Sequence, residues 1–111
     1  LDKLFQLYES GNLPLVIQLC QAEGIDKKEF VRMLYEKYLD TRYNASNAHS
    51  FYYTVDPDPA TCTDDFRFCI YHYIISNTYS YWYVLKGFHS NQTYDTLDNI
   101  FDKFIEIIEN E

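Results

Sequence analysis

The chain has few glycines and few cations. Only three glycines occur in 111 residues, so a glycine-rich loop of the kind that cradles phosphate is missing. No apolar run approaches the ~18 residues that a membrane-spanning helix needs, and we expect a soluble protein without membrane contact. Nine Lys and Arg stand against 17 Asp and Glu, a formal net charge of −8. Such a charge repels phosphate backbones and favours a protein partner with a basic surface over nucleic acid.

Cysteine is scarce and odd in number: Cys20, Cys62 and Cys69. Three thiols at irregular spacing do not suggest a disulfide framework, and the first residues contain no basic stretch followed by an apolar signal segment. We therefore expect reduced thiols and a cytoplasmic protein, in the cytoplasm of the host cell if a phage encodes it. Cys62, Cys69 and His72 are ligand types that zinc prefers, but a nearby fourth ligand is missing, so we expect no metal and no cofactor.

Signatures of catalysis are missing as well. The sequence shows no Ser-His-Asp or Cys-His arrangement and no pair of carboxylates in an evident cleft. We predict that the protein is not an enzyme.

Hydrophobic residues, by contrast, make up 47% of the chain and aromatic residues 19%. This composition and length predict one folded domain over residues 1–111, with a helical subregion at 1–43 and a sheet plus closing helix at 50–111. Apolar residues at helical spacing, interrupted at Gly11 and Gly24, predict three helices in the first 43 residues. Asp26 is a candidate N-cap for the third helix, which the pattern extends to about Tyr43.

After a polar connector at 44–50, the pattern changes to that of strands. We predict strands at 51–55, 66–75 and 79–86, an acidic loop at 56–65, and an amphipathic helix at 96–111 with acids opposite its apolar stripe. The predicted fold class is α+β, with three N-terminal helices, a small antiparallel sheet of about three strands and a C-terminal amphipathic helix.

The second and third strands contain an unusual concentration of aromatic residues. A two-residue turn near Asn77 would place Ile70 opposite Leu85, and would gather Tyr71, Tyr73 and Trp82 on the sheet face that also carries Arg67. A three-residue turn would instead build a ladder of tyrosines. Those rings are either covered by another segment, such as 51–53, or form an interface, because Tyr and Trp supply large contact area at small entropic cost.

Acidic side chains form a second candidate surface. They lie in the 56–65 loop and along the last helix: Asp56, Asp58, Asp64, Asp65, Asp98 and Asp102. Their spacing is not that of an EF-hand loop, and a solvated loop is the simplest interpretation. The alternative is a negative strip that occupies the basic nucleic-acid channel of another protein, a strategy that small phage-encoded inhibitors use repeatedly.

The stretch "LCQAEGIDKKEFVRML" (19–34) resembles the helix-turn-helix unit of DNA-binding regulators. Gly24 and Ile25 would form its turn, and the resemblance implies that Lys27, Lys28 and Arg32 face the DNA groove. The alternative is a three-helix core unit with similar packing, which can also bind protein.

These observations lead to a primary hypothesis and two alternatives. The primary hypothesis is a small acidic, non-catalytic protein-binding module. In its most concrete version it is an inhibitor from a phage or mobile element that blocks a nucleic-acid-binding protein, of the anti-defence or DNA-mimic type, such as an anti-CRISPR protein. The first alternative is a helix-turn-helix transcriptional regulator. The second is a homodimer that covers its aromatic face with its own copy.

Overall fold

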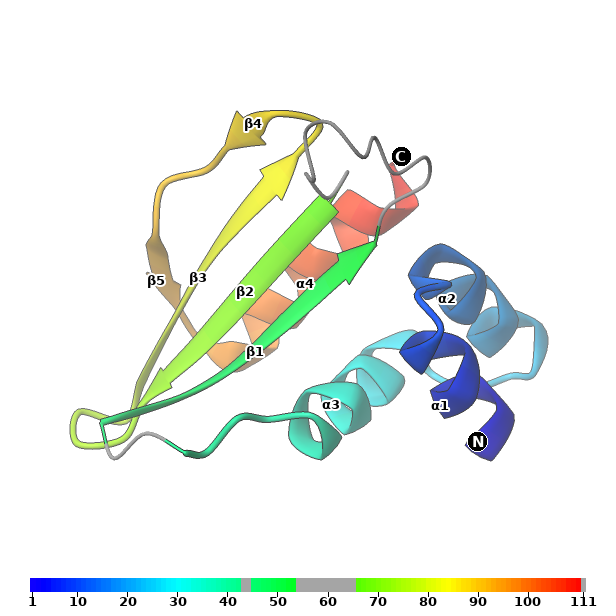
Figure 1. The fold of residues 1–111 in the computed structure, drawn as a ribbon, viewed down its shortest axis with the longest axis horizontal. Helices are drawn as coiled ribbons and strands as arrows, with labels where there is room; N and C mark the ends of the chain where they lie inside the picture. Colours follow the sequence, from blue (N-terminus) through cyan, green and yellow to red (C-terminus); the bar gives the residue numbers. More distant parts are fainter. Residues whose placement is uncertain (43–44, 54–65, 111) are drawn as a thin grey trace.

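The computed structural model describes residues 1–42, 45–53 and 66–110. Four helices and five strands occur in this part of the chain (Figure 1). In chain order they are α1 (Asp2–Glu9), α2 (Leu13–Ala22), α3 (Lys27–Lys37), β1 (Ser46–Tyr53), β2 (Phe66–Tyr73), β3 (Thr78–Leu85), β4 (Phe88–His89), β5 (Thr93–Asp95) and α4 (Leu97–Glu109). The predicted α+β class, with three N-terminal helices and one C-terminal helix, is confirmed.

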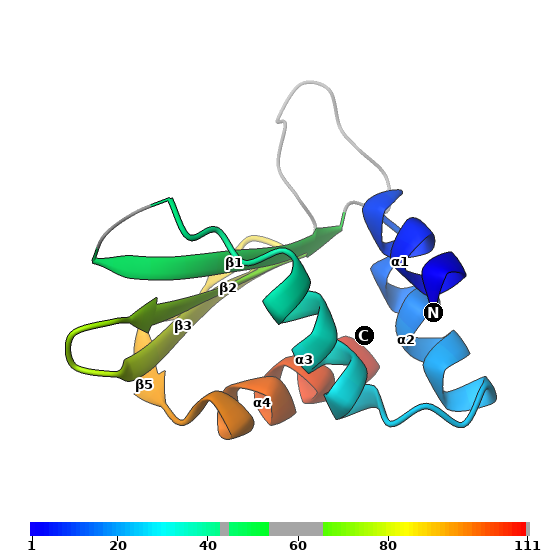
Figure 2. The same ribbon diagram turned by 90° about the horizontal axis from the view of Figure 1, so that it is seen from below.

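The strands form one antiparallel sheet in which β2 pairs with β1 and β3, while β4 and β5 both pair with the other edge of β3. Figure 2 shows the sheet from its side, with α3 and α4 packed under one face and α1 and α2 beside them. No helix of the described residues lies over the other face. None of the helices described is both long enough and apolar enough to cross a membrane.

The helices begin and end largely where the sequence predicts. Gly11 and Gly24 adopt positive φ angles of 88° and 72° after α1 and α2, a conformation that glycine takes without a steric penalty. The Asp26 carboxylate accepts a hydrogen bond from the Glu29 amide at 3.0 Å and caps α3. The predicted end of α3 at Tyr43 is wrong, since the helix ends at Lys37.

The early end of α3 has a tertiary cause. Beyond the helix, Asp40 exchanges two backbone hydrogen bonds with Ala48 of β1, at 2.8 and 3.1 Å. This pairing requires extended backbone and overrides the local helical pattern. The predicted polar connector is also wrong in part, because β1 begins at Ser46. Polar side chains are compatible with an edge strand that has one open face.

The β2–β3 connection differs from the predicted two-residue turn. Residues 74–77 form the loop, and Asn77 takes a positive φ of 51°. Ile70 therefore lies opposite Tyr81 rather than Leu85, a register shift of four residues. Because side chains alternate between the faces with a period of two, a shift of four leaves every residue on its predicted face.

Two short strands were not predicted, and they make the sheet larger than the expected three strands. After β3 the chain reverses at Lys86 and Gly87, both with positive φ, and β4 then pairs with the end of β3. β5 adds three more residue pairs next to Tyr79–Tyr81. At two and three residues, both strands are too short to show a period-two pattern in the sequence.

The core lies between the sheet and the helices. The ring of Phe104 in α4 has its centroid 4.4 Å from that of Phe51 and 5.3 Å from that of Phe68. Phe30, Val31 and Leu34 of α3 are fully buried in the same cluster. Each buried side chain of this size contributes about 1.5–3 kcal/mol to folding. α4 keeps its predicted stripe, and Thr96 caps it by accepting a hydrogen bond from the Asn99 amide.

Candidate protein-binding face

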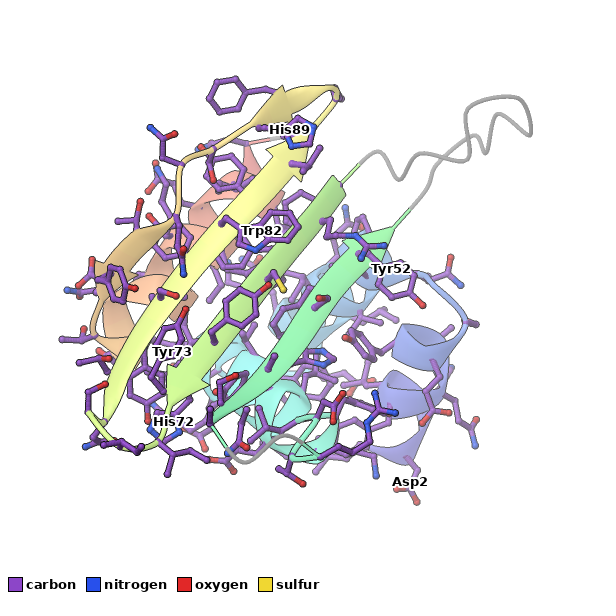
Figure 3. All side chains as sticks on the ribbon, turned by 60° about the vertical axis from the view of Figure 1, so that its left-hand side comes forward. Asp2, Tyr52, His72, Tyr73, Trp82 and His89 are labelled. Carbon is purple, nitrogen blue, oxygen red and sulfur yellow. The ribbon has the colours of Figure 1, made fainter. Side chains whose placement is uncertain are left out.

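The sheet face opposite the helices is rich in aromatic side chains. Tyr71 and Tyr73 of β2, Trp82 of β3 and Tyr94 of β5 share this side, as the pairing of Ser80 with both Tyr71 and Tyr94 requires. Figure 3 shows Tyr73 and Trp82 in front of the ribbon, with the helices behind it. We call these four residues the aromatic face. The sequence correctly predicted that Tyr71, Tyr73 and Trp82 share a face. It did not predict Tyr94 there, because β5 was not predicted.

Hydrogen bonds and ring contacts fix the rings in place. The indole Nε1 of Trp82 donates to the Tyr71 hydroxyl at 3.0 Å. The Tyr71 and Tyr73 rings are stacked with centroids 6.4 Å apart, and Tyr94 lies 6.0 Å from Tyr73. A surface held in this way loses little side-chain entropy when a partner binds.

Gln92 fixes the other end of the face. Its Nε2 donates to the Tyr73 hydroxyl at 2.8 Å and to Ser80 Oγ at 2.9 Å, and Ser80 Oγ donates to Tyr73 at 3.3 Å. Ser80 is fully buried beneath these groups. The Tyr73 hydroxyl therefore accepts two hydrogen bonds, and within the described residues its own proton has no acceptor. That proton is available to a partner.

The middle of the face contains a buried thiol. Cys69 lies opposite Trp82, and its Sγ is 3.0 Å from Ser50 Oγ. Burial, followed by the hydrogen bond with Cys69, raises the pKa of Tyr71, so its phenol stays protonated at neutral pH. His72 points to the other side of the sheet, where its ring stacks on Tyr79. The described residues contain no group of three metal-ligating side chains, and Cys62 lies outside them.

The charges on this side of the sheet are few. Among the described strand residues that face this way, Arg67 is the one Lys or Arg, and there is no carboxylate. Beside the rings, β1 contributes the small side chains of Ser46, Ala48 and Ser50, followed by the exposed ring of Tyr52 opposite Arg67. The surface therefore consists of a row of aromatic rings on β2, β3 and β5 and a neighbouring row of mostly small side chains on β1.

The acids proposed for binding lie on the opposite layer. Asp98 and Asp102 belong to α4, where the Lys28 ammonium contacts their carboxylates at 2.7 and 3.0 Å. Arg32 is 3.3 Å from Asp98, and Lys27 forms an ion pair with Glu109. The hydrogen bond from Lys28 lowers the pKa of Asp98. The hydrogen bonds with Asp98 and Asp102 in turn raise the pKa of Lys28. Asp56, Asp58, Asp64 and Asp65 lie outside the described residues.

Two sets of candidate residues are thus paired with each other. The three cations that the helix-turn-helix resemblance assigns to a DNA groove all contact acids of α4, although each side chain stays partly exposed. Phosphate contacts by α3 would have to compete with these acids. Conversely, Asp98 and Asp102 cannot join the aromatic face in one flat interface, because α4 packs on the other side of the sheet.

No family model, no curated protein and no solved structure matches the chain.

Proposed function

We propose that the protein is a non-catalytic protein-binding module and that its partner covers the aromatic face. The observation that carries this proposal is the hydrogen-bonded set of Tyr71, Tyr73 and Trp82 on a sheet face that no described helix covers. Ordered aromatic rings with polar tips are the side chains that contribute most to protein interfaces.

The charge of the surface favours protein over nucleic acid. Sheets that bind RNA also stack bases on aromatic rings, but they need cations for the phosphates. Arg67 is the one such side chain on the described part of this face, and the whole chain has a net charge of −8. A single-stranded nucleic acid would be repelled at long range and held by few contacts on arrival.

A more specific version of the proposal is an inhibitor from a phage or mobile element that blocks a nucleic-acid-binding protein. Its small size and excess of acids support this version. The overall negative charge would draw the protein toward a basic partner, and the neutral aromatic face would supply the contact area.

An affinity capture experiment tests the proposal. The immobilised protein is exposed to an extract of the cells in which it acts, and retained proteins are identified by mass spectrometry. We expect a specific partner that Trp82→Ala and Tyr73→Ala lose. Phe88→Ala is the matched control, because Phe88 is an exposed ring on β4 that belongs to the other side of the sheet.

Three outcomes would overturn the proposal. Capture that survives Trp82→Ala would place the interface elsewhere. Binding of single-stranded RNA that depends on Trp82 would show a base-stacking sheet. Light scattering that finds a dimer, with Trp82→Ala monomeric, would show that a second copy covers the face. Circular dichroism of each variant verifies that it is folded.

A further inference from the structure

A pocket of about 250 Å³ lies between the end of α1 and the outer edge of β1, the edge that does not pair with β2. Figure 2 shows the end of α1 beside this strand. Residues at the C-terminal ends of α1 and α3 and in β1 line it: Tyr8, Glu9, Gly11, Tyr38, His49, Ser50 and Tyr52. Sequence reasoning missed it because its walls come from segments far apart in the chain.

The walls are largely aromatic. The Tyr8 and Tyr38 rings have centroids 5.1 Å apart, and the His49 ring lies 5.9 Å from Tyr38. Tyr52 is 55% exposed at the mouth, and the Arg67 guanidinium lies 5.6 Å from its ring centroid. Aromatic faces attract cations, and the Lys37 ammonium, which does not line the pocket, already lies 5.8 Å from the Tyr38 centroid.

Glu9 supplies a negative charge to the same space. One of its carboxylate oxygens accepts a hydrogen bond from the Tyr38 hydroxyl at 2.6 Å, and the described residues give the other oxygen no partner. Glu9 is exposed and lines the pocket. A carboxylate among electron-rich rings makes a favourable site for a cation.

His49 adds no opposing charge. Its Nδ1 lies 3.1 Å from the Tyr38 carbonyl, which can only accept, so Nδ1 carries a proton. Its Nε2 is 2.6 Å from the Tyr8 hydroxyl, which donates to it when the ring is neutral. Burial lowers the pKa of His49 to about 4, so the ring is neutral at physiological pH. The lining then carries one formal charge, the carboxylate of Glu9.

The pocket opens next to a free strand edge. Asp40 pairs with Ala48, so the outward backbone groups of β1 belong to Ala48 and, two and four residues on, to Ser50 and Tyr52. Neither Ser50 nor Tyr52 makes a backbone hydrogen bond on this side to another described residue. An extended segment could continue the line of the Asp40 backbone there and place a side chain in the pocket.

We propose that this site binds an extended segment of a partner protein, with a lysine side chain in the pocket. Lysine fits better than arginine because a guanidinium prefers two carboxylate oxygens, and Tyr38 already uses one oxygen of Glu9. The rings then surround a compact ammonium group. The site uses none of the four rings of the aromatic face, although Ser50 and Tyr52 border the same side of the sheet, and it goes beyond the function proposed above.

Peptide titration tests the site. The probe is the capped pentapeptide Thr-Val-Lys-Val-Thr, and its counterparts carry Arg, Glu or norleucine in place of Lys. Two-dimensional NMR follows the amides of Ser50 and Tyr52. We expect saturable shifts with the Lys peptide, weaker binding of the Arg peptide, and none with the Glu peptide. Glu9→Gln should weaken binding at least about fivefold, the equivalent of about 1 kcal/mol.

The matched control is Glu23→Gln, which removes an exposed acid after α2 and should leave the affinity within about twofold. Equal shifts with the norleucine peptide, no shifts with any peptide, or unchanged affinity in Glu9→Gln would each overturn the proposal. The titration does not use the partner of the aromatic face, so its failure leaves that proposal standing.

Discussion

The indole nitrogen of Trp82 and the hydroxyl of Tyr71 are joined by a 3.0 Å hydrogen bond across the β2–β3 pair, on the open side of the sheet. Two rings on neighbouring strands are thus held in one arrangement before any partner arrives. Because Trp82 is the only tryptophan in the chain, its fluorescence reports on this arrangement.

Tyr71→Phe should therefore change the tryptophan emission and reduce the free energy of unfolding by about 1 kcal/mol, since the indole N–H loses its acceptor. Urea unfolding with fluorescence detection measures both effects. Tyr94→Phe is the control, because the Tyr94 hydroxyl makes no hydrogen bond to another described residue. Identical emission and stability in Tyr71→Phe would show that the bond does not order the face.

Tyr35 and Tyr8 should respond in opposite ways to loss of the hydroxyl. The Tyr35 hydroxyl is buried and has no hydrogen-bond partner among the described residues, so Tyr35→Phe should leave stability unchanged or raise it by up to about 1 kcal/mol. The Tyr8 hydroxyl bonds to His49, so Tyr8→Phe should cost about 1–3 kcal/mol by leaving Nε2 unpaired. Chemical denaturation of the two variants measures their free energies of unfolding, and equal losses of stability would contradict the prediction.

The stability of the protein should fall as the pH decreases from about 6.5 to about 4. Burial lowers the pKa of His49 from 6.5 to about 4, so in this range the unfolded chain binds a proton that the folded chain does not. The contribution is complete above 6.5, and its slope approaches about 1.4 kcal/mol per pH unit within the window. Thermal unfolding in a buffer series measures it. His49→Gln should flatten the curve, and an unchanged slope in this variant would refute the assignment.

Removing the acids of α4 should free the cations of α3. In Asp98→Asn/Asp102→Asn, Lys28 loses the hydrogen bonds that raise its pKa, and that pKa should fall toward 10.5, as NMR titration can measure. In the native chain, Asp98 has a lowered pKa, so its contribution to stability is complete above its ordinary value of 3.8 and is lost as the pH falls through the lowered value.

The same double variant separates the two functional hypotheses. If α3 reads DNA, freeing Lys28 and Arg32 should strengthen salt-dependent binding to duplex DNA in a mobility shift. If the aromatic face is the interface, partner capture should be unchanged and DNA binding should remain absent. A gain in DNA affinity together with lost capture would favour the regulator.

The elements that local pattern determines were predictable. The stripe of α4, the N-cap at Asp26 and the breaks at Gly11 and Gly24 depend on neighbours within a few residues, and the structure keeps them. The faces of β2 and β3 were predicted although the register was not. The side of the sheet that a residue faces changes only if the register shifts by an odd number of residues, and here it shifted by four. The register itself depends on the length of the loop between the strands.

The features that long-range contacts determine could not be read from the sequence. The end of α3 depends on Ala48, and Lys28 contacts Asp98, which lies 70 residues further along the chain. The pocket joins Tyr8, Tyr38 and His49 from three separate elements. The sequence could show the candidate acids and cations, but not that they neutralise each other. That required the packing of α4 beside α3.

The position of α4 in the chain has a consequence for synthesis on the ribosome. This helix supplies Phe101 and Phe104 to the core, and its residues are translated after the five strands that the structure describes. Until they leave the exit tunnel, the helix-side face of the sheet has α3 but not α4, and the buried rings of Phe51 and Phe68 lack their contact with Phe104. The core therefore cannot be completed until α4 has been synthesised, and the apolar surface that α4 covers stays exposed during that interval.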